Sequence, residues 1–388
     1  MKIAMMVRAY LASPVPNDIA YSPTGVAIAI ADGLTARGHE VTFFGPEGTQ
    51  LAANVETCGV RPLASNAKEL FDLVSVTDLF KDYLPSLYDQ YMTRAMFERA
   101  RAGEFNALFF HHPESAAPYA TLFPDVPVFY TIHDYLDSTR KQIIEMHHSV
   151  NQHFISISNS QRRDAPDLNY AATVYNGIDT DKFAFSDSHE DYLIFAGRIV
   201  PEKGLKEAVQ VALATEKRLI ITGQIHPTSQ WYFDEHVKPY LSDKILYLGM
   251  IDKDQLVKYY QKALALLVPI QWEEPFGLTM AEAMSCGTPV IAFRRGSVPE
   301  VIDDGKTGFI VDNTTAMIEA VHKVGTISRK QCRKHVETRF SLDHMIDNYE
   351  KVLVNTLRPP KKNGKNEAKK LILGLKKFSD KLLTNVPH

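Results

Sequence analysis

The sequence has no long apolar segment, few cysteines and no internal repeat. No apolar run in the 388 residues reaches the ~18 residues that a membrane-spanning helix needs. The three cysteines are odd in number, widely separated and without metal-ligand spacing, which argues against a disulfide framework and fits a reducing cytosol. The first seven residues are strand-like and too short for a secretory signal. We therefore expect a cytoplasmic protein.

Positive charge is scarce in most of the chain and concentrated at its end. The formal net charge is −3, but residues 358–388 hold nine Lys or Arg against Glu367 and Asp380, so the remaining residues carry −10. An acidic body argues against a nucleic-acid-binding core. The hydrophobic content of 45% and the charged content of 23% are typical of a soluble globular protein.

The chain is too long for one ordinary core, so two domains of roughly 150 to 200 residues each are expected. Apolar, β-branched runs alternate with helical patterns, which is typical of parallel sheets with crossover helices. We predict an α/β fold with domains at 1–179 and 180–340, a closing helix at 341–357, and a tail at 358–388. A polar segment at 179–191 is the predicted hinge. The predicted strands are Lys2–Val7, Glu40–Phe44, Ala107–His111, Val126–Ile132 and Phe154–Ser158 in the first domain, and Tyr192–Ala196, Arg218–Thr222, Ile245–Leu248, Ala263–Val268, Pro289–Phe293 and Gly308–Val311 in the second.

The most informative stretch reads Glu274-Pro-Phe-Gly-Leu-Thr-Met-Ala-Glu282 and places two carboxylates across the start of a predicted helix. Gly277 permits the turn, and the free N–H groups of a helix start at Phe276–Leu278 suit a phosphate. A carboxylate is better suited to accept hydrogen bonds from the vicinal hydroxyls of ribose or hexose. Phosphate, ribose and sugar together describe a nucleotide sugar.

This stretch continues into Gly296-Ser-Val-Pro-Glu300. From Pro275 to Asp312 the run resembles the signature of retaining glycosyltransferases of family 4, and Glu274 and Glu282 match that family's two-glutamate motif. The resemblance covers nearly all of residues 1 to 355. It implies the GT-B architecture, in which two Rossmann-like domains face a central cleft, and a nucleoside diphosphate sugar as donor.

A second motif, Gly197-Arg198-Ile-Val-Pro-Glu-Lys203, follows a predicted strand and resembles the family's Gly-Arg loop. The resemblance implies that Arg198 and Lys203 neutralise the diphosphate. Cations placed there stabilise the charge that develops on the leaving group more than the ground state. Many glycosyltransferases of other folds use an Asp-x-Asp metal site, but Asp179-Thr-Asp181 lies in the predicted hinge. We therefore expect no metal and no cofactor.

The first domain contributes two further motifs. Thr131-Ile-His133-Asp134 matches the family's Thr-x-His-Asp pattern, whose histidine points at the donor sugar, so His133 is expected to bind a hydroxyl or orient the reacting sugar rather than act as general base. Asp134 either contributes there or caps the following segment. Gly25 lies in the loop that approaches the donor phosphate, where the family usually has two glycines, and Thr24 is the predicted helix cap.

Two glycines, Gly223 and Gly249, each follow a strand of the second domain and resemble the family's turns beside the nucleobase. Met250 and Ile251 would offer backbone groups to the base. Backbone contacts do not select one base, so the nucleotide stays open, with a UDP-sugar favoured over a GDP-sugar.

Together these motifs predict a retaining glycosyltransferase that transfers a hexose of the glucose or mannose type. The acceptor is not identified, and envelope polysaccharide, glycolipid and glycoconjugate synthesis are all compatible. By analogy with the family, Glu274 holds sugar hydroxyls and Glu282 holds the ribose. Two alternatives stay open: a phosphorylase or epimerase that uses the same cleft, and a non-catalytic nucleotide-sugar-binding subunit. Arg198, Lys203 and His133 argue against the second alternative.

The tail is predicted to form a basic amphipathic helix. Residues 366–385 place four apolar side chains on one stripe and lysines around the opposite side. Such a helix can lie on an anionic membrane, here the inner face, and bring the enzyme to a lipid-linked acceptor. Docking of the tail on the acidic body is the alternative.

Overall fold

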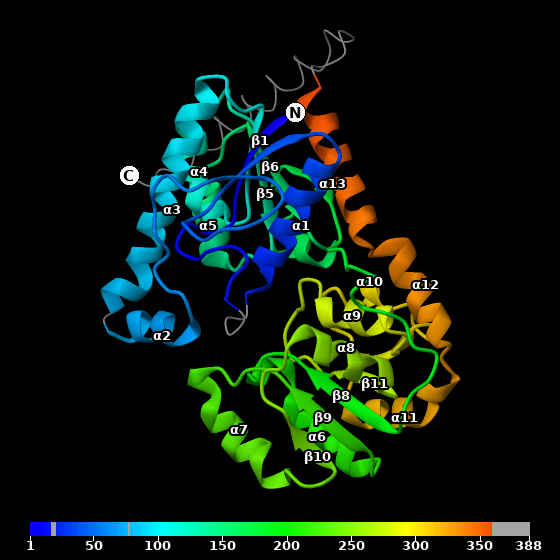
Figure 1. The fold of residues 1–388 in the computed structure, drawn as a ribbon. Coiled ribbons are helices and arrows are strands. Elements are labelled where there is room, and N and C mark those ends of the chain that lie inside the picture. Colours follow the sequence, from blue (N-terminus) through cyan, green and yellow to red (C-terminus); the bar gives the residue numbers. More distant parts are fainter. Residues whose placement is uncertain (17–20, 77, 359–388) are drawn as a thin grey trace, which may run out of the picture. The chain divides into compact units, whose positions relative to one another are not determined.

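The computed structural model describes residues 1–16, 21–76 and 78–358 (Figure 1). Residues Met1–Val352 form one compact unit, and a second unit begins at Leu353. The predicted tail helix at 366–385 lies outside the described residues. No helix in the described part of the chain is both long and apolar enough to cross a membrane.

The first sheet is parallel throughout and has the strand order β3-β2-β1-β4-β5-β6-β7. Its central strands are buried along their whole length, as expected for a sheet covered on both faces. The strands are β1 (Lys2–Met6), β2 (Glu40–Phe44), β3 (Asn54–Glu56), β4 (Ala107–Phe110), β5 (Val128–Ile132), β6 (Gln152–Ser156) and β7 (Tyr170–Thr173). The helices of this part are α1 (Ser22–Ala36), α2 (Ala67–Val76), α3 (Asp78–Arg101), α4 (Pro113–Leu122), α5 (Ser138–Met146) and the 3-10 helix η1 (Ser160–Asp164).

The second sheet is also parallel and has the order β10-β9-β8-β11-β12-β13. Its strands are β8 (Tyr192–Ala196), β9 (Arg218–Thr222), β10 (Ile245–Tyr247), β11 (Ala265–Val268), β12 (Val290–Phe293) and β13 (Gly308–Val311). Its α-helices are α6 (Leu205–Ala214), α7 (Gln230–His236), α8 (Lys253–Lys262), α9 (Leu278–Ser285), α10 (Val298–Val301), α11 (Thr314–Lys323) and α12 (Arg329–Arg339), and α13 (Leu342–Leu357) follows. The 3-10 helices are η2 (Pro201–Lys203), η3 (Pro227–Ser229), η4 (Lys238–Tyr240) and η5 (Val324–Thr326).

The predicted α/β fold with two parallel sheets is confirmed, and every predicted strand is present within a few residues of its expected ends. The sequence analysis missed β3 and β7. Both are short strands at the two edges of the first sheet, and both are largely half-buried or exposed. An edge strand that is not fully buried needs no continuous apolar run, which is why neither one was visible in the hydrophobic pattern. The predicted boundary at residue 179 stays a prediction.

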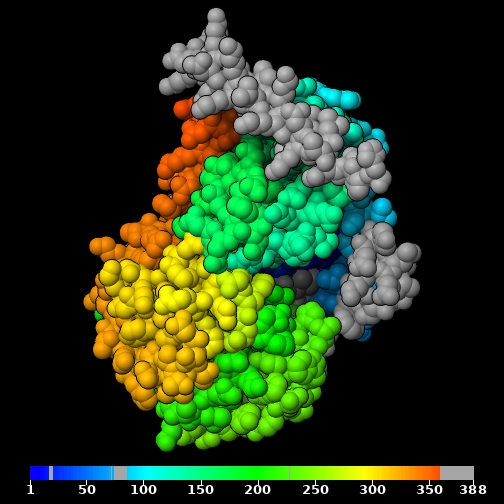
Figure 2. All heavy atoms as spheres, turned by 180° about the vertical axis from the view of Figure 1, so that it is seen from behind, coloured from blue at the N-terminus to red at the C-terminus, as the bar shows by residue number. Residues whose placement is uncertain are grey.

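The chain passes between the two sheet regions at two adjacent places. The N–H of Ile178 donates to Phe340 O (2.7 Å), and the N–H of Leu342 donates to Ile178 O (3.1 Å). After this crossing, α13 lies beside α1 (Figure 1), where a side chain on Gly33 would meet Ile346. The helix α13 begins at Leu342, one residue after the start expected for the closing helix, and its closing role stays a prediction. In the space-filling view, the green segment near residue 160 also lies against the yellow segment near residue 300 (Figure 2).

The predicted hinge is irregular, as expected, but arginines of α12 hold its backbone. Arg333 Nη1 donates to Thr180 O (2.9 Å) and Phe183 O (2.8 Å), and Arg329 Nε donates to Ser186 O (2.9 Å). Because these carbonyls are bound to side chains of the second sheet region, the later part of the segment belongs structurally to that region.

Candidate functional site

In both sheets the strand order reverses beside the first strand. β1 lies between β2 and β4, and β8 lies between β9 and β11. Ligands of open α/β sheets bind outside the carboxyl ends of the strands at such a reversal. The predicted Gly-Arg loop follows β8, the Glu274 loop follows β11, and His133 follows β5. The fold thus places the predicted residues at the edge where this rule expects a ligand.

The loop after β8 is fixed against the end of β11. It forms η2 and ends at Gly204, whose φ is +74°. A Cβ atom on Gly204 would lie 1.8 Å from Pro269 O, so only glycine allows this approach. Gln271 N–H also donates to Glu202 O (2.8 Å). The two loops that carry the predicted cation and the predicted carboxylate are therefore held side by side.

Lys203 and Glu274 form an ion pair at this junction. Lys203 Nζ lies 2.5 Å from Glu274 Oε2, and Trp272 Nε1 donates to the same oxygen (2.9 Å). The ammonium also lies 4.9 Å from the centre of the Trp272 ring. Glu274 is only 8% exposed, so its charge depends on these two donors. The pairing was not predicted, because 71 residues separate the two partners.

The predicted helix start after Glu274 is confirmed. Gly277 has a left-handed φ of +79° and precedes α9, which begins at Leu278. Among the described residues, neither the Gly277 N–H nor the Leu278 N–H has a protein acceptor. These groups and the helix dipole can receive an anion. Phe276 is 1% exposed and its side chain lies in the core, so only its backbone is available.

Glu282 is the fifth residue of α9 and is half-buried. The Tyr260 hydroxyl lies 3.5 Å from its Oε2. Burial raises the pKa of Glu282, and the nearby Lys253 ammonium opposes that shift. A carboxyl group without a close cation is suited to accept hydrogen bonds from a hydroxyl-bearing ligand.

The turns predicted to border the nucleobase meet at the same edge. Gly197 N–H donates to Thr222 O (3.0 Å), and Gly223 N–H donates to Gly249 O (2.9 Å). Met250 follows with 46% of its surface exposed, and Ile251 is half-buried. The carboxyl ends of β8, β9 and β10 thus come together, as the sequence positions of these glycines predict.

Arg198 is exposed beside these turns. In the described residues its guanidinium forms no ion pair, in contrast to the Lys203 ammonium. Its charge is therefore available to an anionic ligand. No hydrogen bond in the described part of the chain joins Arg198 to Glu274 or Glu282, or joins His133 to Glu274.

In the first domain, His133 pairs with a second histidine. His111 follows β4 directly, and its Nδ1 lies 2.7 Å from His133 Nε2, with the two rings stacked. Burial lowers the pKa of His133 to about 3 and holds the pKa of His111 well below its usual range. His133 is therefore neutral and can donate or accept one hydrogen bond per ring nitrogen.

Two predicted caps are wrong. α5 is capped by Asp137, whose side chain accepts the Arg140 N–H (2.8 Å), and not by Asp134, which is exposed. The cap position of α1 is Tyr21, and Thr24 lies inside the helix with its hydroxyl buried and unpaired. Pro23 occupies the first turn of α1, and the helix starts at Ser22, three residues before the start that a Thr24 cap requires. Gly25 is exposed, and a side chain there would meet nothing within 4 Å.

Sequence analysis missed three residues that support the site. Trp272 binds Glu274, His111 binds His133, and Ser297 holds the Glu274 backbone through its N–H (2.9 Å). Only His111 had a usable signal, because it follows a strand adjacent to the one before His133. Among the described residues, no group of three or more His, Cys, Asp or Glu is arranged to hold a metal.

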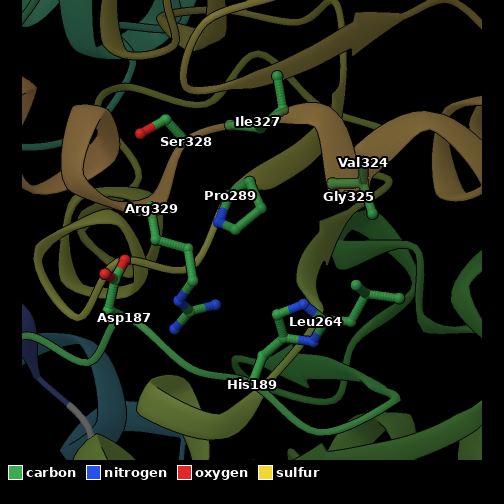
Figure 3. A pocket seen from close by; sticks show the side chains of 9 residues that line it. All are labelled: Asp187, His189, Leu264, Pro289, Val324, Gly325, Ile327, Ser328 and Arg329. Carbon is green, nitrogen blue, oxygen red and sulfur yellow. The ribbon is translucent and has the colours of Figure 1, made fainter.

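A separate hollow of about 260 Å³ is lined by Asp187 and His189 of the predicted hinge segment and by Arg329 of α12 (Figure 3). Arg329 points into it between Asp187 and His189. Arg329 is 7% exposed, and its guanidinium donates to carbonyls of Ser186, Ala263 and Gln261, among other acceptors. Burial lowers the pKa of Arg329. The hollow contains none of the predicted site residues, and its arginine is fully used in holding the backbone.

Comparison with known proteins gives the same class for both halves. The family model "Glycosyltransferase Family 4" matches residues 25–182, and the model "Glycosyl transferases group 1" matches residues 178–339. Spore coat protein SA of Bacillus subtilis (strain 168) is 22% identical over an alignment of 396 positions, which covers 90% of this chain and 98% of that protein.

Two solved structures share the fold. Sucrose-phosphate synthase from Thermosynechococcus elongatus aligns with a TM-score of 0.69 at 16% identity, over 92% of this chain and 99% of that chain. HepE of Anabaena, solved in complex with UDP-glucose, aligns with a TM-score of 0.68 at 14% identity, over 92% and 100%. The chain therefore belongs to the family 4 type of GT-B glycosyltransferases, as its motifs predicted.

Proposed function

We propose that the protein is a retaining glycosyltransferase that transfers a hexose from a UDP-sugar to an acceptor hydroxyl. The observation that carries the proposal is the junction at the second sheet's strand reversal. There Lys203, Glu274 and the free N–H groups before α9 lie within one pair of loops. HepE, which has the same fold, was solved with UDP-glucose.

Different residues bind the diphosphate, the ribose and the sugar of the donor. Arg198, Lys203 and the Gly277–Leu278 N–H groups stabilise the diphosphate as its charge develops. Glu282 accepts hydrogen bonds from the ribose, and Glu274 does so from the sugar. Lys203 must then exchange part of its contact with Glu274 for the phosphate. In the proposed donor complex, Lys203 contacts the diphosphate and Glu274 contacts the sugar, at the two ends of the scissile bond.

The reaction that we propose proceeds with retention at the anomeric carbon. The acceptor oxygen forms a bond to the anomeric carbon on the face from which the diphosphate departs. The bond between the anomeric carbon and the phosphate oxygen breaks, and that oxygen takes the acceptor proton. No protein base is required, which agrees with a neutral His133 whose pKa of about 3 makes it a weak proton acceptor. His133 instead hydrogen-bonds to a sugar hydroxyl.

The first test is thermal unfolding with UDP, GDP, ADP or dTDP, each in excess EDTA. A ligand at 100 times its dissociation constant adds ~2.7 kcal/mol, which corresponds to several degrees at most in a protein of this size. We expect a clear shift with UDP that EDTA does not remove. A shift that requires a divalent ion contradicts metal independence, and no shift with any diphosphate contradicts the proposed donor.

The second test addresses stereochemistry through slow hydrolysis of UDP-α-glucose without an acceptor. A retaining enzyme releases α-glucose first, which ¹H NMR detects before mutarotation. Initial β-glucose contradicts retention. A protein that binds UDP but releases no sugar would be the non-catalytic subunit considered above.

We further propose that the basic tail brings the enzyme to an anionic membrane surface. The support is the apolar stripe and opposing lysines in the sequence of residues 366–385. Deletion of residues 359–388 is expected to reduce co-sedimentation with phosphatidylglycerol vesicles and to leave the UDP-induced thermal shift unchanged. Equal co-sedimentation of both forms contradicts the anchor.

A further inference from the structure

The motif Gly296–Glu300 is a part of the family signature that the donor site leaves without a role. It follows β12 and continues into α10. Ser297, near its start, is fully buried and donates from its N–H to Glu274 O (2.9 Å) and from its hydroxyl to Phe276 O (2.9 Å). This end of the motif therefore fixes the backbone of the loop that carries Glu274.

Glu300, at the other end of the motif, contacts the first domain. Its Oε1 accepts the Ser160 N–H (2.7 Å), and its Oε2 accepts the Asn159 N–H (2.8 Å). The Asn159 side-chain amide (3.1 Å) and the Tyr175 hydroxyl (2.9 Å) donate to Oε2 as well. All four partners are donors, so they require a group that only accepts, and hydrogen bonds to a carboxylate are the stronger kind.

From Ser160 the contacts continue to the turn that carries His133. The next residue, Gln161, is fully buried, and its Nε2 donates to Ile132 O and to Asp134 O, both at 3.0 Å. These two carbonyls flank His133. A continuous series of hydrogen bonds thus runs from the Glu274 loop through Glu300 and η1 to the His133 turn, along the contact visible in Figure 2.

We propose that Glu300 is a positioning residue that fixes the His133 turn relative to the loop carrying Glu274. In this role it acts through its protein hydrogen-bond partners and not through the substrates. The inference rests on the proposed function, because it takes Glu274 and His133 as groups that act on one donor sugar. Groups on two domains must hold that sugar in one geometry, and an error of about 1 Å can lower the rate by about 100-fold.

The test is the isosteric variant Glu300→Gln, assayed as the full-length protein. The new amide NH₂ faces donors, so the variant loses contacts with η1 while keeping the size of the side chain. We expect kcat for UDP release from UDP-glucose to fall 10- to 50-fold. The UDP dissociation constant and the donor KM should stay within 2-fold, since the nucleotide contacts belong to the second domain.

Two further variants separate positioning from general destabilisation. Glu319→Gln makes the same change at an exposed residue of α11 and should match the wild type. Tyr175→Phe removes one of the four donors to Glu300 and keeps the ring, so kcat should fall only 2- to 4-fold. Melting temperatures are measured for all variants, and kinetics are taken well below them.

The outcomes are distinct. A Glu300→Gln variant with wild-type kcat, or with UDP affinity reduced as much as kcat, overturns the positioning role while the proposed function stands. A wild-type protein that neither binds UDP nor turns over UDP-glucose refutes the proposed function instead.

Discussion

The two sides of the candidate site differ in how they use charge. In the second domain, Lys203 and Glu274 form an ion pair with 2.5 Å between Nζ and Oε2, and Arg198 has no ion-pair partner among the described residues. In the first domain, His111 is buried, His133 is half-buried, and the two stacked rings are neutral. The charged residues of the second domain, here called the charged side, suit a diphosphate whose charge grows during the reaction. The two histidines of the first domain, here called the neutral side, suit hydroxyl groups. The cations that suit the diphosphate therefore lie in the second domain, whereas Glu274 of the second domain and His133 of the first both suit sugar hydroxyls.

The largest expected effect comes from removing a cation on the charged side. Lys203→Met keeps the apolar stem but cannot stabilise the leaving diphosphate, so kcat should fall by about 10²- to 10³-fold, as for loss of one oxyanion donor. Steady-state UDP release measures this. Lys206→Met, a nearby lysine in α6, is the matched control and should retain full activity. Equal activity of the two variants would remove Lys203 from the mechanism.

The neutral His133 should make the folded protein less stable at acidic pH. The pKa of His133 is about 3 in the folded protein and near 6.5 in the unfolded chain, so between these values only the unfolded chain takes up the proton. Stability is therefore lost as the pH falls below about 6.5, and His133 alone accounts for about 2 kcal/mol at pH 5. The pH dependence of chemical denaturation from pH 7 to pH 5 measures this loss.

The control for that experiment is a histidine away from the buried cluster. His133→Gln should reduce the dependence of unfolding free energy on pH, with the part due to His111 remaining, whereas His322→Gln, on the exposed face of α11, should leave it unchanged. Identical slopes in both variants would show that His133 is protonated in the folded state, and the contrast between the two sides would fail.

A smaller effect is expected at Glu282, the residue of the second domain that we propose binds the ribose. Glu282→Gln removes a charged acceptor, and a hydrogen bond to a charged group contributes about 1.5 kcal/mol, so UDP should bind roughly 10-fold more weakly. Titration calorimetry with UDP measures the affinity, and kcat at saturating donor should change little. Glu319→Gln again serves as control. A fall in kcat with unchanged UDP affinity would contradict the ribose role.

Individual site residues could be predicted from the sequence, whereas the contacts between them could not. Gly277 and the start of α9 were predictable because a glycine before a helical pattern is a local signal. The Lys203–Glu274 pair and the Glu300 contacts join residues 71 and about 140 positions apart, and no local pattern encodes them. Thr24 was misassigned because a proline at the helix start moved the first turn.

The double passage of the chain at Ile178 and Phe340–Leu342 restricts how the two sheet regions can move. A single tether would permit both tilting and twisting. Two connections that are hydrogen-bonded side by side permit the sheet regions to tilt about the line that joins the connections. They resist twisting of one sheet region relative to the other. A relative movement of the two sheet regions is therefore expected to be mainly a tilt about this line, which would change the distance between Glu274 and His133.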